Sequence, residues 1–169
     1  GKEMASRITA ITNAGIPVVS HLGLTPQSLS QLGGYRIQGK SLTSFKKLLT
    51  DILAVEKAGA VFHLLECVPE EVTQEIYRHV KNPLYGIGSG RHVDGQLVIS
   101  HDMLGLFVGD VDPKFVKKYA DLSSIIKEAF GKYKSDIENN KFPEKKHLYS
   151  IDGEDLAKIK EYSDKFSAD

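Results

Sequence analysis

Short apolar runs bounded by glycine or proline recur along the chain, and each has the pattern of a strand buried in a parallel sheet. The first run carries IPVVSHL between two glycines, and the second carries AVFHLLECV between Gly59 and Pro69. Two further runs follow the turn sequences NP and DG. The predicted strands therefore span residues 16–22, 60–68, 84–88 and 96–101.

Helical spacing fills the segments between and after these runs. Apolar residues recur there every three or four positions with charged residues between them, as on an amphipathic helix. Asp121 and Gly131 are candidate breaks in the longest such segment. The predicted helices span residues 2–14, 45–55, 70–80, 113–133 and 156–166. Strands that alternate with helices predict βαβ units and an α/β fold with a parallel sheet.

The composition narrows the classes of function. The 169 residues carry 22 Lys and Arg against 22 Asp and Glu, so the formal net charge is zero. Nucleic-acid surfaces and polybasic membrane patches both need an excess of Lys and Arg, so we expect neither nucleic acid nor membrane as a partner. No apolar run approaches the roughly 20 residues of a membrane-spanning helix. A single cysteine, Cys67, excludes an internal disulfide, and we expect a cytoplasmic protein.

Polar residues that end otherwise apolar strands are the candidate functional residues. Functional groups of parallel α/β folds gather at the carboxyl ends of the strands. The candidates are, in chain order, His21, Glu66, the glycine-rich turn 86–90, and His101 with Asp102. The histidines show no metal-ligand spacing, and His63 is interpreted as a strand residue.

Glu66 is the most informative candidate. A carboxylate that closes an apolar strand is partly removed from water, which suits a general base. The structural alternative is a carboxylate that caps the next helix or pairs with an arginine, and the residues alone leave both open. The adjacent Cys67 is interpreted as a buried structural thiol rather than as a nucleophile.

The other candidates also have structural alternatives. His21 either contacts a ligand or is a buried histidine bonded to backbone. Gly33 and Gly34 allow positive φ in a shaped loop or in a simple turn. The turn 86–90 would offer backbone N–H groups to an anion. Its G-x-G-x-G spacing is not the dinucleotide fingerprint, so close packing is the favoured interpretation.

Several motifs occur together in a specific order. GIPVVSHLGLTPQS stands at 15–28, GGYRIQG at 33–39, LECVP at 65–69 and GIGSG at 86–90, followed by DGQ, HD and FP. No general constraint on a fold would produce HLGLTPQ and LECVP in one chain. From residue 1 to about residue 147, the chain resembles the ketopantoate hydroxymethyltransferase (3-methyl-2-oxobutanoate hydroxymethyltransferase) family.

The resemblance implies a (β/α)8 TIM barrel. The four predicted strands correspond to strands five to eight of that barrel, so the chain matches the C-terminal half to two-thirds of the family sequence. Complete barrels usually need about 250 residues. We therefore expect a barrel part over residues 1–147, a helical tail appended over 148–169, and a homo-oligomer, as in the family.

The resemblance also implies a reaction, a one-carbon transfer in pantothenate biosynthesis. A hydroxymethyl group passes from 5,10-methylenetetrahydrofolate, or an archaeal pterin, to 3-methyl-2-oxobutanoate through a magnesium-stabilised enolate, giving 2-dehydropantoate. Glu66 matches the family's proposed general base, and His21 is expected to bind the substrate. The family's Mg²⁺ ligands lie on the first four strands, so they are expected upstream of Gly1 and not in this chain.

Two alternatives of other classes remain open. One is a noncatalytic half-barrel fragment or scaffold that lacks the metal-binding half. The other is a phosphate- or nucleotide-binding module built on the turn 86–90.

Overall fold

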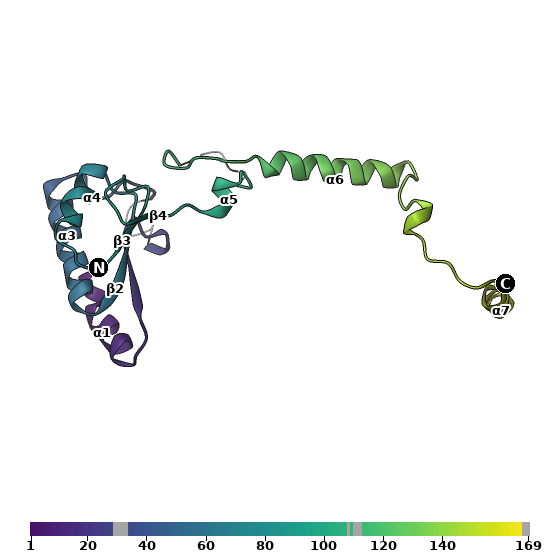
Figure 1. The fold of residues 1–169 in the computed structure, drawn as a ribbon, viewed down its shortest axis with the longest axis horizontal. Coiled ribbons are helices and arrows are strands. Elements are labelled where there is room, and N and C mark those ends of the chain that lie inside the picture. The colour runs from purple at the N-terminus through teal and green to yellow at the C-terminus, as the bar shows by residue number, and fades with distance from the viewer. Residues whose placement is uncertain (29–33, 108, 110–112, 167–169) are drawn as a thin grey trace. The chain divides into compact units, whose positions relative to one another are not determined.

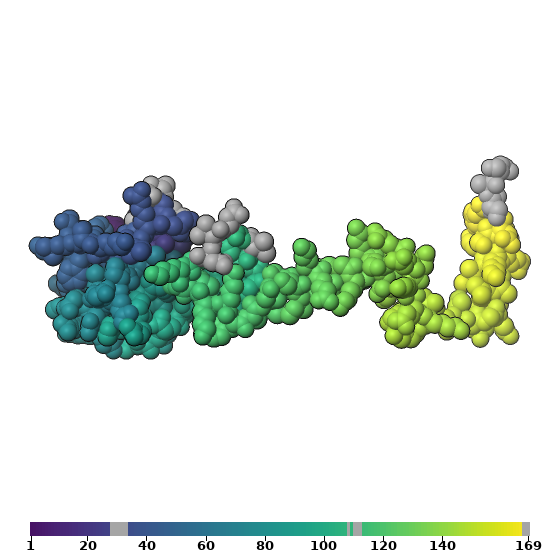
Figure 2. All heavy atoms as spheres, turned by 90° about the horizontal axis from the view of Figure 1, so that it is seen from above, coloured from purple at the N-terminus to yellow at the C-terminus, as the bar shows by residue number. Residues whose placement is uncertain are grey.

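The computed structural model describes residues 1–28, 34–107, 109 and 113–166. The chain divides into two compact units, Gly1–Asp121 and Leu122–Asp169, and each is described by itself. In the space-filling view the purple-to-teal residues, which belong to the first unit, pack closely together (Figure 2). Within the described ranges no helix is both long enough and apolar enough to cross a membrane.

A parallel sheet forms the centre of the first unit. Its four strands in the described residues lie in the order in which they occur in the sequence, and every neighbouring pair is parallel. The predicted α/β class with a parallel sheet is thus confirmed. The strands are β1 (Val18–Gly23), β2 (Ala60–Glu66), β3 (Leu84–Ile87) and β4 (Gly95–Gln96).

Helices precede, connect and follow these strands. The predicted first three helices are confirmed, with α3 capped by Ser41, whose hydroxyl accepts from the Ser44 amide. Glu70 and Glu71 occupy the first turn of α4, where carboxylates oppose the positive end of the helix dipole. In its described residues, the helices of this unit are η1 (Lys2–Met4), α1 (Ala5–Asn13), η2 (Pro26–Ser28), α3 (Leu42–Lys57), α4 (Glu70–Tyr77) and α5 (Ser100–Met103).

The two faces of the sheet have different surroundings, because side chains alternate between them along each strand. Figure 1 shows α1, α3 and α4 along one side of the sheet. That helix-covered face buries Ser20, Leu22, His63, Leu65 and Leu84, and its three leucines pack with helix residues such as Ile8, Ile52 and Ile76. The other face, called the open face below, carries Val19, Phe62, Leu64 and Tyr85. Val19 on this face is 56% exposed although it is apolar.

The strand predicted over residues 96–101 is wrong over most of its length. Only Gly95–Gln96 forms a strand, and the Leu97 amide adds one bond to the Gly86 carbonyl at 2.8 Å. The chain of β3 then turns away at Gly88, where φ is +63°. Among the described residues, those after Leu97 therefore have no partner strand.

The short helix α5 replaces the end of that predicted strand. His101 and Asp102 consequently lie on a helix and not at the carboxyl end of a strand. These two residues were candidates because they were predicted to end a strand, and the structure contradicts that reason.

The helix predicted over 113–133 begins only at Leu122. The Tyr119 amide donates to the Met103 carbonyl of α5 at 2.8 Å, so a tertiary contact takes a hydrogen bond that a helix would make internally. Helical spacing of apolar residues is a weak preference, and such contacts override it.

The second unit is helical in its described residues, with α6 (Leu122–Glu138), η3 (Lys145–His147) and α7 (Gly153–Asp164). Asp121 directly precedes α6, whereas Gly131 lies within it. The predicted tail helix is confirmed as α7, and Asp152 caps it by accepting from the Glu154 amide at 2.8 Å. The boundary after His147 between barrel and tail stays a prediction.

A polar network is buried on the helix-covered face. His63, fully buried on β2, pairs through Nδ1 with the Ser20 hydroxyl at 2.7 Å and through Nε2 with Glu56 at 3.4 Å. The same Glu56 oxygen accepts from the amides of Lys81 and Asn82 at 2.8 and 2.9 Å. One carboxylate of α3 thus holds β2 and the loop that leads into β3.

This network predicts that stability falls in mild acid. Burial lowers the pKa of His63 below its ordinary 6.5, and the attraction of Glu56 only partly offsets this. As the pH falls, His63 of the unfolded chain is therefore protonated at a higher pH than His63 of the folded protein. The free energy of unfolding should fall as pH drops through 6.5 towards the folded pKa, by at most about 1.4 kcal/mol per pH unit.

The measurement is thermal unfolding of the intact protein between pH 5 and 7.5. His63→Gln should flatten the dependence of stability on pH, whereas His79→Gln, which changes an exposed residue beyond α4, should leave it as it is. An equal slope in the His63→Gln protein would show that His63 does not cause it.

Candidate active site

Glu66 is the last residue of β2 and lies at the carboxyl edge of the sheet. Its main chain is fixed from both neighbouring strands. The Glu66 carbonyl accepts from the Leu24 amide at 2.8 Å, and the Cys67 amide donates to the Ile87 carbonyl at 2.9 Å. The Glu66 side chain is 14% exposed, so the predicted partial removal from water is confirmed.

His21 of β1 contacts this carboxylate directly. Its Nε2 lies 3.0 Å from Glu66 Oε2, and the His21 side chain is 29% exposed. The register of β1 and β2 pairs Gly23 with Glu66, so His21 sits two residues before the pairing position, on the same face. Glu66 Oε1 has no hydrogen-bond partner among the described residues. The two residues predicted separately for the site thus lie together.

A residue with positive φ ends β1, and one directly follows each of β2 and β3. These residues are Gly23, Cys67 and Gly88, with φ of 85°, 57° and 63°. At Gly23 a Cβ would overlap the carbonyl oxygen of Glu66, so only glycine allows the two strand ends to lie this close. Cys67 is the exception, because L-residues other than glycine rarely adopt this conformation.

Cys67 has the properties of a structural thiol. It is half-buried, and burial, followed by the charge of Glu66, raises the pKa of the thiol. A raised pKa disfavours the thiolate, which is the nucleophilic form. The geometry thus supports the structural interpretation of this residue.

The turn 86–90 serves close packing. A Cβ on Gly88 would meet the ring of Phe115 at 2.5 Å, and one on Gly90 would meet Glu70 at 2.5 Å. Sequence reasoning missed Ser89, whose buried hydroxyl donates to the Leu65 carbonyl at 2.8 Å and so steadies the residue before Glu66. A small polar residue inside a glycine-rich turn was the available signal.

The remaining candidates lie apart from this pair in the described structure. No interaction between described residues joins His101 or Asp102 to Glu66. Gly33 lies outside the described residues, while Gly34 has φ of 98°. Further along the same loop, the Gln38 amide donates to the Cys67 carbonyl at 2.9 Å, which attaches the loop to the end of β2.

The described residues do not form a magnesium site. Within the parts of the chain that the structure describes, no group of three or more His, Cys, Asp or Glu side chains is placed to hold a metal ion.

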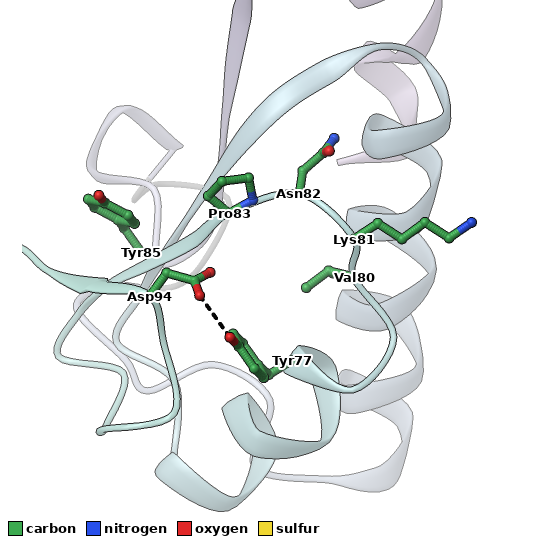
Figure 3. Close-up of a pocket in the computed structure, with 7 residues that line it drawn as sticks. All are labelled: Tyr77, Val80, Lys81, Asn82, Pro83, Tyr85 and Asp94. Carbon is green, nitrogen blue, oxygen red and sulfur yellow. Dashed lines mark hydrogen bonds between the residues drawn. The ribbon is translucent and has the colours of Figure 1, made fainter.

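A cavity of about 420 Å³ lies at the opposite end of β3 (Figure 3). The Tyr77 hydroxyl donates to Asp94 Oδ1 at 2.7 Å, and Asp94 Oδ2 accepts from the Leu84 amide at 2.8 Å. Hydrogen bonds from Leu84 and Tyr77 hold the pKa of Asp94 below its ordinary value. Because Leu84 starts β3, this carboxylate fixes the amino end of the sheet, which in parallel α/β folds serves stability.

The comparison with known proteins decides the family. A sequence model of ketopantoate hydroxymethyltransferase matches residues 1–145. The chain belongs to the ketopantoate hydroxymethyltransferase family. The resemblance inferred from HLGLTPQ and LECVP is thereby confirmed.

Individual relatives agree with this assignment, and each is named 3-methyl-2-oxobutanoate hydroxymethyltransferase. The chain is 46% identical to the protein of Carboxydothermus hydrogenoformans over 159 residues, 94% of this chain and 57% of that protein. It is 47% identical to that of Geobacillus thermodenitrificans over 153 residues, 90% of this chain and 54% of the relative. The chain thus spans little more than half the length of the curated relatives it matches. A parallel α/β sheet is consistent with the barrel that the resemblance implied.

Proposed function

We propose that the protein containing this chain adds a hydroxymethyl group to 3-methyl-2-oxobutanoate, with Glu66 as the general base. The observation that carries the proposal is the position of Glu66 at the carboxyl edge of the sheet, with one carboxylate oxygen bonded to His21 and the other without a partner among the described residues. In parallel α/β enzymes this edge carries the reacting groups. The names of the relatives supply the substrate.

In the proposed reaction, Oε1 of Glu66 takes the hydrogen from C3 of the keto acid as a proton. The C3–H electron pair becomes the enolate, which forms the new C–C bond to the one-carbon unit of 5,10-methylenetetrahydrofolate. Both bonds from that carbon to the folate nitrogens break, and water supplies the hydroxyl group. One nitrogen takes the proton removed from C3 and the other takes the remaining proton of the water, so tetrahydrofolate leaves. The product is 2-dehydropantoate.

In this proposal, the part of the family sequence that this chain does not match supplies the other residues of the active site. It completes a (β/α)8 barrel over the open face and carries the Mg²⁺ ligands and the residues that grip the keto acid. The uncovered apolar residues of the open face, such as Val19, support a covering layer there. Assembly into a homo-oligomer rests on the family resemblance.

The test uses the intact protein with magnesium in D₂O. We expect it to exchange the C3 hydrogen of 3-methyl-2-oxobutanoate for deuterium without any folate, observed as loss of the methine proton signal by NMR. With 5,10-methylenetetrahydrofolate added, 2-dehydropantoate should accumulate. Neither exchange nor product from folded intact protein would overturn the proposal and favour a noncatalytic scaffold.

A further inference from the structure

The contact between His21 and Glu66 has one feature that distinguishes it from a surface ion pair. It joins side chains of two neighbouring strands at the carboxyl edge, and both are mostly removed from water, with exposures of 29% and 14%. Strand positions are rigid compared with loops, so the two side chains are held in register by the sheet itself.

The bonded atoms constrain what each group does. A carboxylate only accepts hydrogen bonds, so at a separation of 3.0 Å His21 Nε2 carries the proton and donates it to Oε2. Nε2 is therefore engaged with the protein, and it is not available to hold a keto acid. Oε1 is left as the oxygen of Glu66 without a partner in the described residues.

We infer that His21 is a positioning residue for Glu66 rather than the substrate ligand that the sequence predicted. The inference deepens the proposed function and rests on it. The Nε2–H group holds Oε2, which stops rotation of the carboxylate and turns Oε1 towards the open side of the sheet where C3 of the keto acid would lie. A hydrogen bond to a charged acceptor is shorter and stronger than a neutral one, which suits this task.

Two substitutions distinguish the roles of the two nitrogen atoms of the His21 ring. Glutamine places its amide N–H near the position of Nε2, so His21→Gln keeps a donor to Glu66. Asparagine places its amide near the position of Nδ1, so His21→Asn removes that donor and keeps a polar group in place of Nδ1. The pair distinguishes positioning of Glu66 from contact with the keto acid through Nδ1.

The readouts are kcat and KM for C3 hydrogen exchange in the intact protein, and the Kd for 3-methyl-2-oxobutanoate by calorimetry. Misplacing a catalytic group by about 1 Å costs on the order of 10²-fold in rate. We expect His21→Asn to lower kcat by about 10- to 100-fold with KM and Kd within about twofold of wild type. His21→Gln should recover most of the lost rate.

A weaker Kd with unchanged kcat in His21→Asn would overturn the inference and make His21 a substrate ligand. Wild-type kinetics in both variants would also overturn it. If His21→Asn does not fold, His21→Ser replaces it with the same expectations.

A third comparison separates this inference from the proposed function. In a Glu66→Gln background, His21→Asn should cause little further loss, because the residue that it positions is already disabled. Full activity of Glu66→Gln alone would instead remove Glu66 as the base, whatever His21 does.

Discussion

Replacing Glu66 with glutamine is expected to slow C3 hydrogen exchange of the keto acid by about 10²- to 10⁴-fold, the usual contribution of a general base. The substitution keeps the size of the side chain and leaves an amide oxygen able to accept the His21 hydrogen bond. It removes the charged oxygen that takes the proton. The effect should therefore appear in kcat, with the fold and keto-acid binding nearly unchanged.

The matched control is Glu75→Gln. Glu75 lies on α4, is 48% exposed and pairs with Arg78, the C-cap residue of that helix. Exchange in this variant should equal that of the wild-type protein, measured by the same NMR signal. Equal rates in the Glu66 variant and the Glu75 variant would show that another group removes the proton.

Replacing Gly23 with alanine is expected to have the largest effect on stability, about 2–5 kcal/mol. The residue has φ of 85°, which an L-residue adopts at a cost. The added methyl group would also overlap the Glu66 carbonyl oxygen and press on Val68. The backbone of Glu66 must then move, so exchange activity should fall as well.

Gly15→Ala separates the two causes. Gly15 has nearly the same φ, 82°, but a Cβ there would meet nothing within 4 Å. The Gly15→Ala protein should lose only the contribution of backbone strain, about 1–2 kcal/mol of the free energy of unfolding, and keep full activity. Chemical unfolding of both variants of the intact protein gives the comparison. Equal losses would mean that the contact with Glu66 relaxes without cost.

The apolar pattern predicted three of the strands because those runs are bounded by glycine or proline and buried on at least one face. It failed after Gln96 because a strand needs a partner as well as an apolar sequence. Leu97, Val98 and Ile99 look like a strand but are 42%, 38% and 54% exposed. The partner strand is lost because β3 turns away at Gly88. The sequence of residues 97–101 carries no sign of that turn.

The site shows the same division between local and tertiary information. The position of Glu66 and His21 at strand ends follows from the sequence, since each closes an apolar run. Their mutual hydrogen bond depends on the register of β1 against β2, which is set by side-chain packing over the whole sheet. The positive φ of Cys67 could not be predicted either, because the residue type does not favour it.

Neighbouring residues of β2 face opposite sides of the sheet, so they are under different evolutionary constraints. Leu65 lies in the core with Ile52, so a substitution there lowers the stability of the fold. Leu64 and Tyr85, paired across the open face, lie outside that core and face the side where we propose the substrate to bind. Directed evolution of substrate range should therefore start from open-face positions, where mutations explore new specificity while the helix-covered face preserves the scaffold.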